Sequence, residues 1–462
     1  MKKNIMAGFI LIMVMTLLQL AAVNNCWAAP LEEGSFKVVG YYSGDLFDEP
    51  VEKLATDKLT HIIYAFLIPR GDGSLMELEK PEQLRQLVSQ AHRDGAEVFI
   101  AVGGWSYKNQ VLQPVFETVA ASAGGRKQLV ENICAFVSEY DLDGVELDWE
   151  HPHEGSIADY EKLVTELKTA LDKQDKEFTA ALNGAWSATE GPAVSMLMTD
   201  KCLDCFSFIN VMAYDMNNEA HSPLWFADTS IDYWLNRGVP AEKIVVGMPL
   251  YARPSWIQYR HLVIQDPDFA YTDYASTVPL ASHYNGLNTL REKTIIALSK
   301  AGGVMLFDVN EDSDDETSVV AMIDGMIKRT AHLTPAEMKG YVSVVLEERE
   351  LTFGPEEGLG VPFIDENQRT MIPFRKPLEA ISAVVGYEPE IQTVTAEKDG
   401  IKVRVIIGQN ILYVNDQPLT MDTRAIIKEG RTYIPLRQVF EAFGFAVEWH
   451  GSSRTAVIKQ AV

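Results

Sequence analysis

The chain is poor in cysteine and in positive charge. Its 462 residues include four cysteines, Cys26, Cys134, Cys202 and Cys205. That number is too small for a disulfide framework, although Cys202 and Cys205 could close a small loop. No second Cys or His pair lies at zinc-ligand spacing, so we expect no metal site. Lys and Arg total 40 against 65 Asp and Glu, and the net charge of −25 argues against a nucleic-acid or anionic-membrane partner.

Long apolar runs are also scarce, and the chain has one, from Ile5 to about Ala22. Lys2 and Lys3 precede it, and small residues follow it as far as Ala28. This order predicts a secretory signal peptide over residues 1–28, cleaved after Ala28, with an uncleaved membrane anchor as the alternative. No other stretch approaches the roughly 20 apolar residues of a transmembrane helix. We therefore expect a secreted, extracellular protein.

Short apolar runs alternate with helical patterns from residue 36 to about 330, which is typical of a parallel sheet. The predicted strands are 36–42, 60–67, 97–102, 143–148, 178–183, 206–213, 243–248 and 303–307. Eight strands in roughly 300 residues predict an α/β fold, a closed (β/α)8 TIM barrel over residues 34–330. An open doubly wound sheet is the competitor, but no Gly-x-Gly-x-x-Gly turn follows the first strand.

Beyond the barrel, we expect a charged linker at 331–359 and a small duplicated α+β domain at 360–462. The motif at 369–375 recurs 62 residues later at 431–437, each copy before a short helical pattern. Residues 411–419 read as a hairpin turning at Asn415 and Asp416. This tail resembles the domain named for the N-terminal region of copper amine oxidase, which suggests attachment to the cell envelope. We expect no copper, because His450 is the only histidine after His332.

The most informative segment is residues 143–150, Asp-Gly-Val-Glu-Leu-Asp-Trp-Glu. Side chains alternate along a strand, so Glu146, Asp148 and Glu150 share one face. Like charges so close repel, and at least one carboxyl should keep its proton near neutral pH, as a general acid requires. Apolar residues at the alternate positions favour a strand buried on both faces over a solvated acidic turn.

This octet closely resembles the catalytic signature of family 18 glycoside hydrolases, the chitinase family, which reads Asp-x-x-Asp-x-Asp-x-Glu. Glu146 stands where the family usually has aspartate. Residues 101–104 resemble the third-strand Ser-x-Gly-Gly motif with Ala101 in place of serine, and residues 212–215 match the sixth-strand Met-x-Tyr-Asp motif. Residues 302–307 resemble the eighth strand, with Phe307 where the family usually carries tryptophan.

The resemblance implies substrate-assisted retention without metal or organic cofactor. Glu150 would protonate the glycosidic oxygen while the substrate's own 2-acetamido carbonyl attacks the anomeric carbon. Asp148 would bind the acetamido N–H, Tyr214 would position its oxygen, and Asp215 would support the adjoining sugar.

Two departures from the family pattern are linked by a hypothesis. We expect Glu146 to be a buried acid below Asp148 that fills the space left by the missing hydroxyl at Ala101.

Substrate binding is expected along the strand ends. Gly103 and Gly104 let the backbone approach closely, and flat aromatic faces suit pyranose rings. The candidates are Tyr41, Gly103, Gly104, Trp105, Trp186, Met212, Tyr251 and Phe307. The segment at about 254–300 is too short for the insertion that deepens the groove of some chitinases, which indicates a shallow cleft and endo action.

Three functions remain open. The first is a secreted glycosidase that cuts β-1,4 bonds of N-acetylglucosamine polymers, chitin or its oligomers. The second keeps this mechanism but acts on peptidoglycan or spore cortex, and the third is a catalytically silent sugar-binding barrel. No specific protein partner is inferred.

Overall fold

The computed structural model describes residues 36–461 except 45, 47–48, 217, 219, 278, 355–357 and 359. The predicted signal peptide lies outside the described residues. Within them, no helix is both long enough and apolar enough to cross a membrane.

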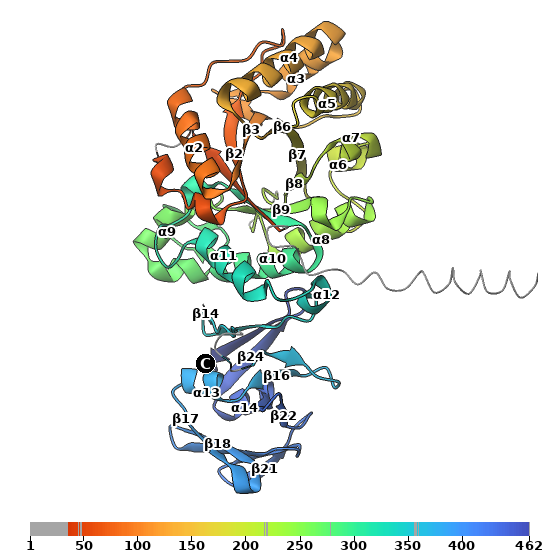
Figure 1. The fold of residues 1–462 in the computed structure, drawn as a ribbon. Helices are drawn as coiled ribbons and strands as arrows, with labels where there is room; N and C mark the ends of the chain where they lie inside the picture. The colour runs from red at the N-terminus through yellow and green to blue at the C-terminus, as the bar shows by residue number, and fades with distance from the viewer. Residues whose placement is uncertain are drawn as a thin grey trace, which may run out of the picture.

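Eight parallel strands close into a barrel, which confirms the predicted fold (Figure 1). The ring runs β1-β12-β9-β8-β7-β6-β3-β2, and β1 closes it by pairing Lys37 with Gly303 on β12. Each observed strand overlaps a predicted one. They are β1 Lys37–Ser43, β2 His61–Leu67, β3 Glu97–Gly104, β6 Gly144–Trp149, β7 Glu177–Asn183, β8 Ile209–Met212, β9 Ile244–Pro249 and β12 Gly303–Phe307.

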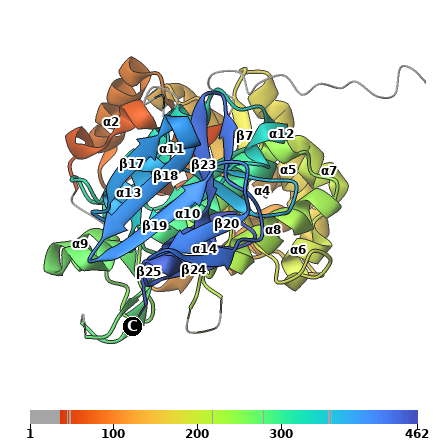
Figure 2. The ribbon, with the colours of Figure 1, turned by 90° about the horizontal axis from the view of Figure 1, so that it is seen from below.

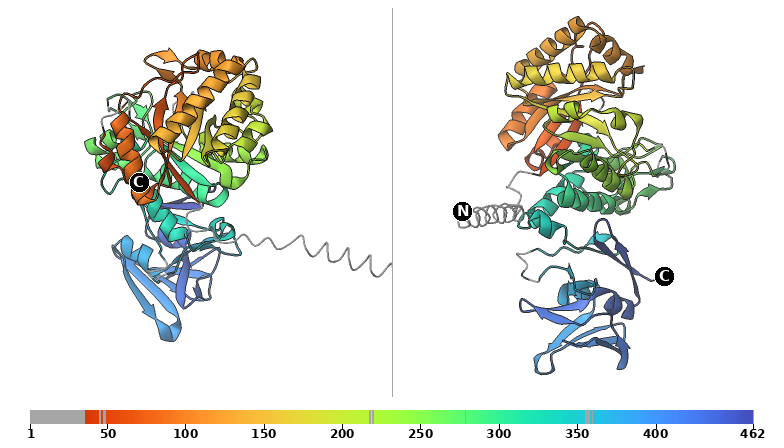
Figure 3. Two further views of the ribbon diagram at one scale, coloured as in Figure 1. Left: turned by 45° about the horizontal axis from the view of Figure 1, so that its top comes forward. Right: turned by 90° about the vertical axis from the view of Figure 1, so that its right-hand side faces the viewer.

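Amphipathic helices surround the strand ring, with the smaller tail beside it (Figure 3). In α2, Pro81 occupies the first turn, and Leu84, Leu87, Val88 and Ala91 form the buried stripe. Gly95, at φ 86°, ends the helix in the left-handed conformation that glycine adopts readily. The helices are α2 Pro81–Asp94, α3 Gln113–Ala121, α4 Ala123–Tyr140, α5 Ile157–Asp172, α6 Ala193–Leu197, α7 Asp200–Cys205, α8 Leu224–Asn236, α9 Tyr259–Gln265, α10 Leu287–Lys300 and α11 Val319–Thr330.

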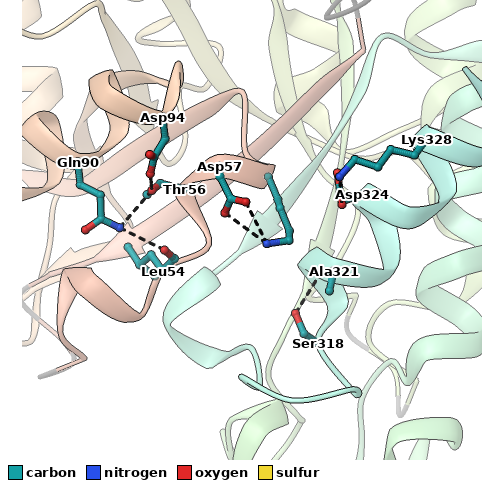
Figure 4. A network of polar contacts seen from close by, with 10 residues as sticks. Leu54, Thr56, Asp57, Gln90, Asp94, Ser318, Ala321, Asp324 and Lys328 are labelled. Carbon is teal, nitrogen blue, oxygen red and sulfur yellow. Dashed lines mark hydrogen bonds and ion pairs between the residues drawn. The ribbon is translucent and has the colours of Figure 1, made fainter.

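Polar contacts lie on both sides of the seam where the first and last units of the barrel meet (Figure 4). Gln90 of α2 donates to the carbonyl of Leu54 at 3.2 Å and to the hydroxyl of Thr56 at 3.1 Å. Across the seam, the Ser318 hydroxyl accepts from the backbone N–H of Ala321 and so caps α11. The first two bonds hold the loop after β1 against α2, and the third orders the start of α11.

Smaller elements fill the connections on the barrel. Two short hairpins, β4 Ser106–Tyr107 with β5 Gln110–Val111 and β10 Tyr274–Ala275 with β11 Ser282–His283, follow β3 and β9. Cys134, Cys202 and Cys205 carry free thiols, so the loop disulfide considered for the last two is not formed.

The predicted linker at 331–359 is wrong for most of its described length. It contains α12 Pro335–Met338, β13 Ser343–Leu346 and β14 Arg349–Glu350. β13 pairs in parallel with β25 Thr455–Gln460, the last strand of the tail. Val344 and Val345 are buried there, and the charged residues that suggested a linker lie at and after the turn into β14. A pairing over more than 100 residues leaves no local signal.

The sequence repeat folds into two strand–helix units that face each other. β16 Thr370–Pro373 and β23 Arg431–Pro435 pair antiparallel, with Ile372 opposite Ile434, its counterpart in the other copy. α13 Arg375–Ala380 and α14 Leu436–Ala442 follow them. β15 Phe363–Ile364, β22 Ile426–Lys428 and β24 Phe445–His450 extend the two four-stranded sheets.

A five-stranded antiparallel meander completes the tail (Figure 2). Its strands are β17 Val384–Glu388, β18 Thr393–Lys398, β19 Ile401–Ile406, β20 Ile411–Val414 and β21 Gln417–Thr420. The predicted hairpin is confirmed, because Asn415 and Asp416 turn the chain from β20 to β21 at φ 48° and 65°.

The tail packs against α10 of the barrel (Figure 1). Glu292 of α10 is only 4% exposed and accepts hydrogen bonds from His450 Nδ1 at 2.8 Å and from the Ser453 hydroxyl at 2.7 Å. Arg329 of α11 pairs with Glu350 of β14 at 2.8 Å. A buried carboxylate and a half-buried ion pair therefore join the two parts.

Candidate active site

The deepest acid of the site is Glu146, whose side chain is fully buried inside the barrel. Its carboxylate accepts hydrogen bonds from the Tyr41 hydroxyl at 2.8 Å, from Asn210 Nδ2 at 3.2 Å and from the Thr179 hydroxyl. Burial raises the pKa of Glu146 to about 7, although these three bonds act in the opposite direction. Glu146 stands directly opposite Ala101 on β3, as the sequence hypothesis requires.

Asp148 lies two residues nearer the barrel mouth and is 4% exposed. Burial, followed by the negative charges of Glu150 and Glu146, raises its pKa well above the usual range. Its Oδ1 atom is buried and has no hydrogen-bond partner among the described residues. Such an atom is costly to leave unsatisfied, so it is suited to bonding a polar group of a ligand.

Glu150 stands at the mouth, with 18% of its side chain exposed. Burial and the charge of Asp215 raise its pKa to about 7, against a hydrogen bond from the backbone of Trp105. His151 Nε2 lies 3.5 Å from its carboxylate, and burial lowers the pKa of His151 to about 4. The imidazole is therefore neutral, and Glu150 is a carboxylic acid that can release a proton near pH 7.

Tyr214 and Asp215 follow the end of β8 and differ in charge state. Burial and the charge of Asp148 keep the Tyr214 phenol protonated by raising its pKa well above the usual range. Burial alone would raise the pKa of Asp215, but hydrogen bonds from His221 and Tyr251 and the charge of Arg253 lower it below its usual value. Asp215 is thus an ionised carboxylate next to a neutral phenol.

Arg253 and His221 are polar residues of the site that the sequence did not suggest. Arg253 lies 3.3 Å from the Asp215 carboxylate and 3.9 Å from the ring centre of Trp256. His221 is 1% exposed and lies 3.5 Å from the same carboxylate. Of these two residues, only Arg253 could have been found from the sequence, because it follows the seventh strand two residues after Tyr251.

The aromatic candidates divide into buried and exposed groups. Phe307 lies 5.4 Å from Tyr41, 6.1 Å from Tyr214 and 6.3 Å from Tyr251, measured between ring centres. Tyr41 and Tyr251 are almost completely buried, so they support the floor of the mouth. Trp105 and Trp186 are 55% and 51% exposed and can offer ring faces to a sugar.

Gly103 and Gly104 have φ angles of 124° and 92°, which glycine tolerates best. A Cβ at Gly103 would lie 2.2 Å from the backbone oxygen of Asp148, and one at Gly104 would lie 3.2 Å from the Phe66 ring. The close approach at Gly103 is therefore between strands β3 and β6, and it fixes the backbone that carries Asp148.

Two cavities meet at Asp215. One of about 340 Å³ is lined by Trp186, Met212 and Tyr214 among others, and one of about 690 Å³ by His221 and Arg253 among others. They make the mouth a groove in which Trp186 and Met212 lie on one side of Asp215. Within the described part of the chain, no group of three His, Cys, Asp or Glu side chains could hold a metal ion.

Comparison with known proteins agrees with this geometry. Residues 37–312 match the family model of glycosyl hydrolases family 18. The chain belongs to this family. Residues 359–458 match the copper amine oxidase N-terminal domain, as the sequence resemblance indicated.

Similar proteins include a chitinase-like effector of Moniliophthora roreri, 28% identical over 48% of this chain and 60% of the relative. An endochitinase of Manduca sexta is 29% identical over 47% of this chain and 45% of the relative. The chain thus matches 45–60% of the length of these two relatives. The crystal structure of the chitinase ChiB of Flavobacterium johnsoniae is 26% identical, covers 63% of this chain and 93% of its own, and has a TM-score of 0.55.

Proposed function

We propose that this family 18 protein is a retaining glycosidase that hydrolyses β-1,4 bonds of N-acetylglucosamine polymers, with chitin oligomers as substrate. The observation that carries the proposal is the pairing of Glu150, whose pKa is about 7, with the buried and unsatisfied Asp148. A second carboxylate nucleophile is not needed if the substrate's acetamido group attacks.

In the first step, Glu150 gives its proton to the glycosidic oxygen as that bond breaks. The acetamido carbonyl oxygen forms a bond to the anomeric carbon, and the positive charge passes to an oxazolinium ring. Asp148 would stabilise this charge by accepting a hydrogen bond from the acetamido N–H at Oδ1, which has no partner among the described residues. In the second step, Glu150 takes a proton from water while the water oxygen bonds to the anomeric carbon. The bond between that carbon and the acetamido oxygen breaks, which opens the oxazolinium ring and restores the acetamido group.

The remaining residues hold this arrangement. The Tyr214 phenol remains a hydrogen-bond donor at neutral pH and would bind the acetamido oxygen. Asp215 would bond hydroxyl groups of the adjoining sugar. Glu146 lies beneath Asp148 and keeps a second acid in the barrel, so that both can share protons during turnover.

The decisive assay follows reducing-end release from chitin pentamer and from purified peptidoglycan. Glu150→Gln should lose about 10²- to 10⁴-fold in kcat, the usual contribution of a general acid. Glu154→Gln, an exposed glutamate four residues further on, is the matched control and should keep full activity. Release of reducing ends from peptidoglycan alone would show that the substrate is cell-wall peptidoglycan and not chitin. Pentamer binding without turnover, unchanged in Glu150→Gln, would identify a silent sugar-binding barrel.

Export and attachment to the cell envelope are further proposals, based on residues 1–28 and on the tail. N-terminal sequencing of protein recovered from culture medium tests the first, with Ala29 expected as the new first residue. A pull-down of the full chain on cell-wall material tests the second.

A further inference from the structure

The tail contains a cavity of about 590 Å³ that is separate from the barrel mouth. It lies between the sheet that holds β24 and β25 and the sheet that holds β15 and β16, with the start of α14 at its edge. Figure 1 shows β24, β16 and α14 side by side in the middle of the tail. Its volume falls within the range of small-ligand sites, about 300–1,000 Å³.

Three arginines line this cavity, and among the described residues only Arg369 is paired with a carboxylate. Arg369 donates from Nε to Asp422 at 2.7 Å. Arg454 has a buried Nε without a hydrogen-bond partner among the described residues. Arg437 is exposed at the rim, and no described contact ties it to an acid. A guanidinium N–H that is enclosed and unsatisfied is costly, and an anion entering the cavity would remove that cost.

The third element of the cavity is an aromatic ring. Trp449 on the edge strand β24 lines the cavity and is 38% exposed. An indole face suits the apolar face of a pyranose, and a guanidinium binds a carboxylate through two parallel hydrogen bonds. Ring and guanidinium together therefore select a sugar that carries a carboxylate, rather than a neutral sugar or a small inorganic anion.

The charge distribution favours the tail as the place for such a ligand. Residues 360–462 contain 12 basic and 12 acidic residues, so the excess negative charge of the chain lies elsewhere. An acidic glycan is repelled by the barrel but not by the tail. Glu448 is the acid on the cavity wall that has no described partner, and the two free arginines outnumber it.

From this geometry we propose that the tail cavity binds an acidic glycan, with Trp449 under a sugar ring and Arg437 and Arg454 on its carboxylate. The site is independent of the chemistry at Glu150. It gives the protein a second carbohydrate contact, specific for polymers that the barrel does not cleave.

Isothermal titration of the full-length protein with galacturonate pentamer tests the proposal. This probe lacks the 2-acetamido group on which the barrel chemistry depends. Its methyl ester has the same rings without the charge and should bind at least about tenfold more weakly. Added salt should weaken binding of the acid form. Arg437→Ala, Arg454→Ala and Trp449→Ala should each weaken binding of the acid form about tenfold.

The control is Arg424→Ala, which removes the same charge from an exposed tail position outside the cavity and should bind like wild type. All four variants should keep wild-type activity on chitin pentamer, so that loss of the tail site is separate from loss of catalysis. Equal binding of acid and ester, equal binding by all four variants, or binding of inorganic phosphate but not of the pentamer would overturn the assignment.

Discussion

The raised pKa of Glu150 should affect two measurable quantities, the pH dependence of stability and the pH dependence of kcat/KM. Its ordinary value of 4.5 moves to about 7 through burial and the charge of Asp215. Ionising this carboxyl in the folded chain therefore costs about 3 kcal/mol more than in the unfolded chain. For an acid with a raised pKa, the stabilising contribution is complete below pH 4.5 and is lost as the pH rises through about 7.

Glu150→Gln removes the ionisation, so the variant should gain stability relative to wild type as the pH rises. We expect the difference in the free energy of unfolding to grow by up to about 3 kcal/mol between pH 4 and pH 8. Urea unfolding of both proteins at several pH values measures it, with Glu154→Gln as the control that shows no such growth. Such a gain in the stability of Glu150→Gln would be an example of the trade-off between stability and activity.

The same ionisation should appear in the kinetics. Because the proposed mechanism requires the acid form, kcat/KM of wild type should fall about tenfold per pH unit above pH 7. The reasoning would be refuted if kcat/KM began to fall below about pH 5.5 and Glu150→Gln gained no stability. Both measurements would then show that Glu150 has the pKa of an ordinary carboxyl group.

Three further tests address other parts of the site. Glu146→Asp should lower kcat by withdrawing the carboxylate from its three partners, and adding Ala101→Ser should restore part of it. A coupling of about 0.5–3 kcal/mol is expected, and strictly additive effects would contradict the hypothesis. Trp186→Ala should raise KM about fivefold with kcat little changed, because an exposed ring face worth about 1 kcal/mol is lost. An unchanged KM would place the sugar elsewhere. Arg253→Met removes a charge that lowers the pKa of Asp215, so the acid limb of the pH profile should move to higher pH. A limb that stays in place would show that Asp215 does not control it.

The strands and the carboxylates were predictable because both depend on local periodicity. Alternation along residues 143–150 puts the acids on one face of β6 and the apolar residues on the other. The structure has Trp149 packed outward on Phe116, with ring centres 5.0 Å apart, while Glu146 and Asp148 are buried inside the barrel. The family motifs then placed each remaining strand end in order around the ring.

The partners of Glu146 could not be predicted in the same way. Tyr41, Thr179 and Asn210 come from β1, β7 and β8, and barrel closure alone brings them to one carboxylate. The sequence suggested Tyr41 as a sugar contact, but its hydroxyl is used by Glu146 and its ring is 1% exposed. Thr179 and Asn210 carry no signal of their own, because a polar residue inside a strand is visible only when its neighbours are known.

The failed linker prediction and the docking of the tail have one physical origin. Both depend on contacts between segments far apart in the sequence: β13 pairs with β25, and Glu292 of α10 is buried against His450 and Ser453. His450→Ala should leave Glu292 enclosed with one fewer donor, at a cost of about 1–3 kcal/mol in the free energy of unfolding. Glu292→Gln with His450→Ala should recover part of this cost, because a neutral amide then replaces the enclosed carboxylate. If His450→Ala unfolds like wild type, the tail is not held at this contact, and α10 would need another reason to bury a glutamate.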